Sequence, residues 1–169
     1  RACSLHRAPR TFRKDTAVTF MPLLNNITLL IALGILYDLV IRNWRKGTAR
    51  FSVAAGVLFA AVAIVGMMTA VVLKPGLIFD GRSIVIALGS FLAGPLTAAI
   101  VVVLSAAYRL YLGGQGTLIG VSVIIESALV GLLWYYLALK RPRLKRWPYL
   151  LLFGFLVHVG MILLLYLLP

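Results

Sequence analysis

The chain has 169 residues, of which 62% are hydrophobic and 12% charged, and its mean hydropathy is +1.03. This composition excludes a soluble globule for most of the chain and indicates an integral membrane protein in a lipid bilayer. The formal net charge is +13, but the 17 basic residues gather at the ends of the apolar segments, so we expect no nucleic-acid partner.

Residues 1–20 differ in composition and periodicity from the rest of the chain. The stretch begins with Arg1 and lacks the apolar core and small-residue cleavage site of a signal peptide. Met21 is the expected natural start. We therefore predict a non-native or disordered extension over residues 1–20 and one transmembrane domain over residues 21–169.

Four segments have the roughly 20 apolar residues that a helix needs to cross the hydrocarbon core. These segments are 21–41, 51–73, 117–139 and 148–168. Between them, residues 83–112 form an apolar run too long for one crossing, and Gly94-Pro95 inside it favours a turn between a short helix and a nearly full one. The predicted fold is an all-α, polytopic transmembrane bundle of about six membrane segments.

Two loops carry most of the basic residues of the membrane region, which the positive-inside rule places in the cytoplasm. The residues are Arg42, Arg45, Lys46 and Arg50 in one loop, and Lys140, Arg141, Arg143, Lys145 and Arg146 in the other. Both loops can lie on one side only if residues 83–112 form a helical hairpin. Counting one membrane crossing for each helix then places Pro169 on the outer side of the membrane.

Two arginines lie inside the apolar run. Arg82 begins the short helix, and Arg109 lies about one turn inside the outer end of its partner, so both are predicted near the outer leaflet. Guanidinium groups bind carboxylate or phosphate through paired donors, which favours a site for a small anion. The alternative is that both side chains extend to lipid phosphates. Asp80 could pair with Arg82 or cap its helix, whereas Arg109 has no neighbouring acid.

Three further polar residues lie within the predicted spans. Ser105 precedes Arg109 by four residues, so the two share one helix face. The hydroxyls of Ser105 and Ser122 either complete an anion pocket or bond to backbone and to neighbouring helices. Glu126 lies near mid-membrane, where an ionised carboxylate is costly, so we expect it to be protonated or paired with an arginine of the hairpin.

The remaining polar features favour structural roles. Asp38 and Arg42 have the spacing of an intrahelical ion pair, and His158 is expected to pack with a hydrogen bond to backbone. Gly113 and Gly114 are expected turn residues. No nucleophile stands beside a base and no cluster of metal-ligating residues is present, so the sequence predicts neither an enzyme active site nor a cofactor or metal.

The order of these motifs resembles a known family. An Asp-x-Arg motif comes first and is followed by an apolar stretch that ends in Gly-Pro. An aromatic-Arg-x-x-x-Gly-Gly motif comes next, and then an acid on the following helix. In chain order the residues are Asp80, Arg82, Gly94, Pro95, Tyr108, Arg109, Gly113, Gly114 and Glu126. This pattern resembles the LytS-YhcK type of five-transmembrane receptor region, over roughly residues 21–169.

The resemblance implies a signal-input domain in a bacterial inner membrane, ahead of a cytoplasmic histidine kinase of the LytS kind or a diguanylate cyclase. It implies cell-wall regulation or metabolite sensing, and a homodimer if the output is a kinase. Arg82, Arg109 and Ser122 would face a small extracellular anion such as a carboxylate, with Asp80 and Glu126 as further candidates. Because Pro169 is predicted outside, we expect a C-terminal truncation before the output module.

Two other functions fit the same residues. A substrate-binding transporter subunit, similar in helix number to those of vitamin importers, would also use a short helical hairpin and polar residues at the midplane. A structural membrane-assembly protein would need neither a ligand nor an output domain.

Overall fold

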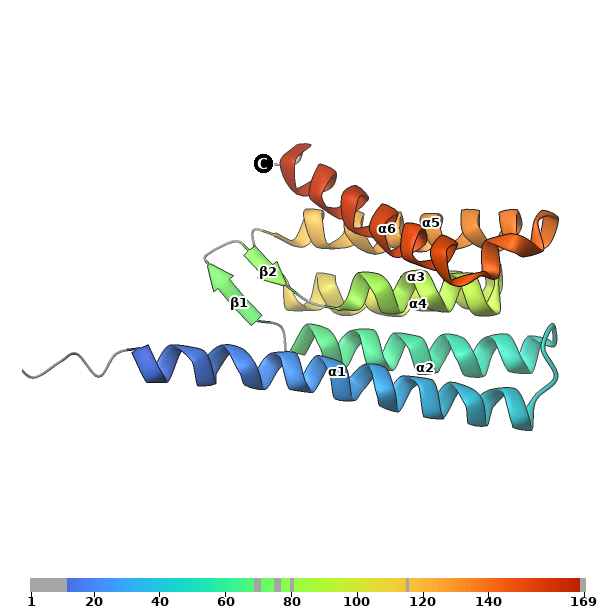
Figure 1. Ribbon diagram of the computed structural model, residues 1–169, viewed down its shortest axis with the longest axis horizontal. Helices are drawn as coiled ribbons and strands as arrows, with labels where there is room; N and C mark the ends of the chain where they lie inside the picture. The colour runs from blue at the N-terminus through green and yellow to red at the C-terminus, as the bar shows by residue number, and fades with distance from the viewer. Residues whose placement is uncertain (1–11, 69–70, 75–76, 80, 115, 168–169) are drawn as a thin grey trace, which may run out of the picture.

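A computed structural model describes residues 12–68, 71–74, 77–79, 81–114 and 116–167, with side chains over 24–68, 81–114 and 116–167. Its elements, shown in Figure 1, follow in chain order: α1 (Phe12–Asn43), α2 (Ala49–Met68), β1 (Val71–Lys74), β2 (Leu77–Phe79), α3 (Arg82–Ala93), α4 (Pro95–Leu112), α5 (Thr117–Lys140), the 3₁₀ helix η1 (Pro142–Lys145) and α6 (Trp147–Leu167).

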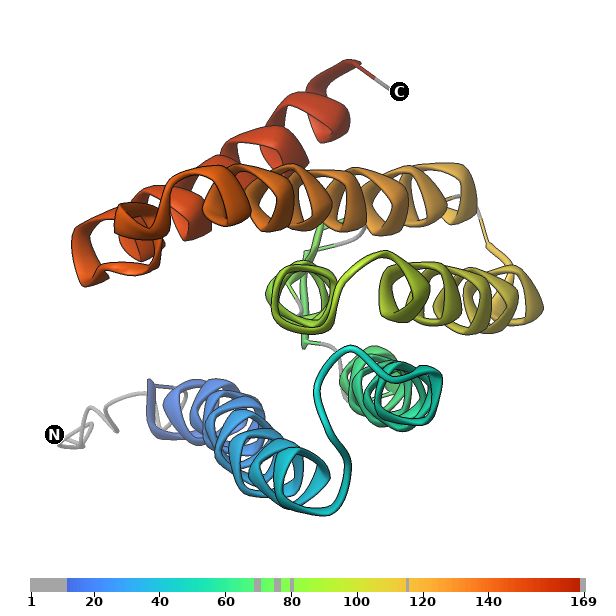
Figure 2. The same cartoon turned by 90° about the vertical axis from the view of Figure 1, so that its right-hand side faces the viewer.

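The helices form three layers of two, with α1 and α2 in one outer layer, α3 and α4 in the middle, and α5 and α6 in the other outer layer (Figures 1 and 2). The loops at residues 44–48 and 141–146 lie together at one end of the bundle, which we call the basic end. The strands β1 and β2 and the α4–α5 connection lie at the opposite end, called here the ribbon end. Consecutive helices are antiparallel, as the predicted hairpin at residues 83–112 requires.

The prediction of an all-helical membrane bundle is confirmed. Within the described residues, five helices are long and apolar enough to cross a bilayer; they cover Leu24–Asn43, Ala49–Met68, Pro95–Leu112, Thr117–Lys140 and Trp147–Leu167. The exception is α3, whose 12 residues rise only about 18 Å at 1.5 Å per residue. A helix of this length cannot cross the roughly 30 Å hydrocarbon core alone.

The break between α3 and α4 falls at Gly94-Pro95, as predicted. Gly94 has a φ of +85°, which side-chain-bearing residues rarely adopt, and its N–H donates to the Ser90 carbonyl at 3.1 Å. Pro95 takes the first position of α4, where its missing N–H leaves no helical hydrogen bond unmade. The Tyr135 ring of α5 covers this turn, since a Cβ on Gly94 would lie 3.2 Å from the ring.

Two segments differ from the predicted boundaries. The second helix was expected to reach residue 73, but α2 ends at Met68 and Val71–Lys74 pairs antiparallel with Leu77–Phe79. Two adjacent valines and a Pro-Gly sequence between apolar residues favour such a ribbon over a longer helix. At the other boundary, α1 begins at Phe12 rather than Met21, since residues 12–20 contain neither glycine nor proline.

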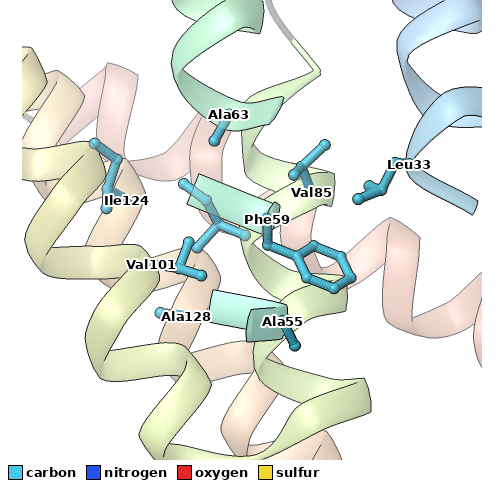
Figure 3. Close-up of a cluster of buried hydrophobic side chains, with 9 residues drawn as sticks. Leu33, Ala55, Phe59, Ala63, Val85, Val101, Ile124 and Ala128 are labelled. Atoms are coloured by element: carbon cyan, nitrogen blue, oxygen red, sulfur yellow. The ribbon is translucent and has the colours of Figure 1, made fainter. Parts of the chain in front are cut away.

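Small residues bring α3 close to its neighbours. On α5, Gly131 contacts the Ala87 carbonyl oxygen, and a Cβ there would also lie 2.8 Å from the Ser90 Cβ. On the opposite side, the Phe59 ring of α2 lies against Gly89, where a Cβ would be 2.8 Å from a ring carbon. Figure 3 shows Phe59 in the main buried cluster, which draws residues from every helix from α1 to α5. The short helix is therefore enclosed by protein.

We predict that Gly131→Ala destabilises the domain by about 1–3 kcal/mol, because the added methyl meets the backbone of α3, which cannot yield as a side chain can. The measurement is thermal unfolding of the purified domain in detergent. Gly34→Ala is the matched control, since a Cβ there meets nothing within 4 Å and alanine favours the helix. Equal melting temperatures for Gly131→Ala and the wild type would contradict the close α3–α5 contact.

Candidate functional site

Arg109 lies across the surface of α5. It belongs to the last turn of α4, where a cation complements the helix dipole. A Cβ on Gly116 would lie 3.3 Å from one of its terminal nitrogens, and a Cβ on Gly120 would lie 3.1 Å from its Cδ. The two glycines, four residues apart, thus form a flat floor that any larger side chain would block.

The polar atoms at this α4–α5 seam have unused hydrogen-bonding capacity. The Arg109 Nε is buried and, within the described part of the chain, has no hydrogen-bond partner. Ser105, on the same face of α4, is fully buried, and its hydroxyl likewise has none there. A guanidinium and a hydroxyl on one helix face can together hold a carboxylate or a similar small anion.

Glu126 faces α6 instead. Its carboxyl contacts Gly160, where a Cβ would collide with it. One oxygen accepts a 3.4 Å hydrogen bond from the Ser127 hydroxyl, and the other is buried without a partner among the described residues. His158 lies on α6, two residues before Gly160. Its Nδ1 donates to the Gly154 carbonyl at 2.8 Å, so the expected backbone hydrogen bond is present.

The other predicted ligand residues take separate positions. Ser122 is half-buried and lies four residues before Glu126, so the two share a face of α5. Arg82 lines a small recess of about 20 Å³ together with residues of α1 and α2, among them Asn26 and Val62. Asp80 lies outside the described residues.

The structure thus distributes the predicted site over three seams. Arg109 lies between α4 and α5, Ser122 and Glu126 lie on the α6 side of α5, and Arg82 lies beside α1 and α2. The convergence of the two arginines on one anion stays a prediction. Sequence reasoning did not identify Gly116 and Gly120 as the floor for Arg109, although their spacing of four is a recognised signal for close helix contact.

The expected ion pair at the basic end is confirmed. The Arg42 Nε lies 2.7 Å from an Asp38 carboxylate oxygen on the same helix face. Both side chains are more than half exposed, so this pair contributes little to stability.

A comparison with protein families finds that a model described as 5TMR of 5TMR-LYT matches residues 34–169. The chain belongs to the 5TM-5TMR_LYT family. The match starts within α1 and runs through α6, so it covers all three helix layers and every predicted ligand residue. Searches of curated proteins and of solved structures found no match to this chain.

Membership of 5TM-5TMR_LYT confirms the resemblance drawn from the sequence and places the chain among multi-pass membrane sensor domains. A sensor domain of this type is not itself catalytic.

We predict that Gly160→Ala and Glu126→Ala are energetically coupled in this 5TM-5TMR_LYT domain. Gly160→Ala alone should destabilise it by about 1–3 kcal/mol, because the new methyl displaces the Glu126 carboxyl. In the Glu126→Ala background, Gly160→Ala should destabilise the domain less. The difference between the two backgrounds, measured by thermal unfolding, should be a coupling energy of roughly 1 kcal/mol. Gly154→Ala on the same helix, which meets nothing within 4 Å, should show no coupling to Glu126→Ala. Additive effects of the Gly160 and Glu126 substitutions would mean that the two residues do not touch.

Proposed function

We propose that this chain is the ligand-sensing input domain of a bacterial inner-membrane sensor protein, and that its ligand is a small anion such as a carboxylate. The output module would be a histidine kinase of the LytS kind or a diguanylate cyclase. The family match and the bundle of apolar helices support the sensor assignment. A kinase output would in addition require a homodimer.

One observation carries the proposed ligand class. The Arg109 Nε is buried at the α4–α5 seam with no hydrogen-bond partner among the described residues. A buried donor without a partner is destabilising, and a bound anion would offset that cost by accepting a charge-assisted hydrogen bond from it. Ser105 adds a buried hydroxyl on the same helix face.

The position of Arg109 favours a built site over contact with lipid phosphates. An arginine that extends to the headgroups runs along the outside of its helix toward water. Arg109 lies against α5, with its Cδ and Nε at Gly120 and a terminal nitrogen at Gly116, at the start of that helix. Glu126 lies on another side of α5, against Gly160, so it leaves the arginine available to an external anion.

The orientation of the bundle makes this site accessible from outside the cell. By the positive-inside rule the basic end faces the cytoplasm, so the ribbon end faces the extracellular side. Arg109 belongs to the last turn of α4, which ends at the ribbon end. An extracellular metabolite could therefore reach it without crossing the hydrocarbon core.

The α3–α4 hairpin would relay the signal. An anion bound between α4 and α5 would shift α4. This helix is joined to the enclosed helix α3 through the turn at Gly94. Because α3 also contacts α2, α5 and α6, a shift of the hairpin repacks every layer. The ligand would change the output only if it binds one of the two hairpin positions more tightly than the other.

We predict that acetate, lactate or succinate raises the melting temperature of the purified domain by roughly 5–10 °C at 100 times its dissociation constant. Arg109→Ala should abolish this rise, because it removes the guanidinium group that would bind the carboxylate. Ser105→Ala should weaken the effect. Arg50→Ala, which removes an exposed arginine at the basic end, is the control and should respond like the wild type.

The proposal would be refuted in either of two ways. An equal response of Arg109→Ala and the wild type would remove Arg109 from the site. The absence of any response to the three carboxylates in the wild type would refute the ligand class.

A further inference from the structure

The basic end contains a recess unrelated to the Arg109 seam. It has a volume of about 350 Å³ and opens between the ends of α3, α5 and α6. Its walls are apolar side chains from these three helices: Phe91, Leu92, Ala138, Leu139 and Leu150. A volume of this size is in the range of small-molecule pockets.

Two lysines from distant parts of the chain line the same recess. Lys46 belongs to the α1–α2 loop and Lys145 to η1, and Tyr135 adds a phenolic hydroxyl. Both lysine side chains are exposed, so their ammonium groups lie in water while the walls beside them are apolar. The recess thus joins a cationic rim to a hydrophobic interior.

Negative charge to balance this rim is scarce. The chain has only four acidic residues, and within the described ranges Asp38 is the one that lies near the basic end, where it pairs with Arg42. The two loops at this end and the helix ends beside them carry the nine basic residues named above. An anionic partner from outside the chain would therefore meet attraction and little repulsion.

Two exposed tryptophans indicate where the membrane surface is expected at this end. Trp44 and Trp147 stand at the same end with 39% and 74% of their surface exposed, as expected for tryptophans at a membrane–water interface. By the positive-inside rule this interface is the cytoplasmic leaflet, whose anionic lipids attract basic segments next to a membrane.

We propose that this recess binds an anionic phospholipid of the cytoplasmic leaflet, with its phosphate between Lys46 and Lys145 and an acyl chain against the apolar walls. A free phosphate would satisfy the lysines but leave the walls uncovered, so the combination favours a lipid. The bound lipid would join the α1–α2 loop to η1 beside Tyr135, whose ring covers the Gly94 turn. Lipid composition would then influence the same hairpin as the extracellular ligand, and this inference does not depend on the proposed anion site.

The test is a titration of the purified domain in neutral detergent micelles with dioleoyl phosphatidylglycerol, followed by thermal unfolding. Because both charge-assisted contacts to one phosphate are lost, Lys46→Gln with Lys145→Gln should weaken binding roughly 100-fold. The matched control is Arg50→Gln with Lys140→Gln, which removes the same charge from the same end outside the recess and should weaken binding much less. All four side chains are exposed, so both double variants should fold.

Two outcomes would overturn the proposal. An equal loss of lipid affinity in both double variants would mean that the lipid is attracted diffusely to the basic end, without a specific site. An equal stabilisation by water-soluble glycerol phosphate would mean that the lysines bind a free phosphate group and that the apolar walls play no part. The lipid site is supported if the control variant keeps the wild-type titration curve, the recess variant does not, and glycerol phosphate has no effect.

Discussion

The close contact between α3 and α5 at Gly131 is the constraint on which the arrangement of this bundle depends. A helix of 12 residues cannot cross the hydrocarbon core, so the backbone at its ends has to be surrounded by protein. Gly131 and Gly89 let α5 and the Phe59 ring of α2 approach α3 closely enough to provide that enclosure. In a bilayer, where helices gain little from burying apolar side chains, such small-residue contacts supply much of the association.

The enclosure of α3 also explains why the polar residues occupy separate seams. Because α3 fills the middle of the bundle, the helices packed against it contact one another at its sides. Arg109 lies between α4 and α5, Glu126 between α5 and α6, and Arg82 beside α1 and α2. A displacement of the α3–α4 hairpin would change all three seams together, which suits a domain that converts ligand binding into a change of packing.

The two ends of the bundle differ in how they could bind a partner. Toward the ribbon end, the Arg109 Nε and the Ser105 hydroxyl are buried polar atoms on one helix face, which favours one small ligand. At the basic end the charges are exposed around a recess with apolar walls, which favours a lipid. The turn at Gly94 lies at the basic end but belongs to the same hairpin as Arg109, so events at the two ends can be coupled through one rigid pair of helices.

The sequence by itself determined the helical bundle, the break at Gly94-Pro95, the position of both basic loops at one end, and the family. These features follow from the length of apolar runs, from the backbone limits of glycine and proline, and from the cost of charge in lipid, all of which act locally along the chain. Only the tertiary structure decided that Arg109 lies on Gly116 and Gly120, that Glu126 meets Gly160, and that Lys46 and Lys145 share a recess. Such contacts depend on the rotation of each helix about its axis. That rotation is set by packing between helices, and a span that is apolar on every side carries no periodic signal from which it could be read.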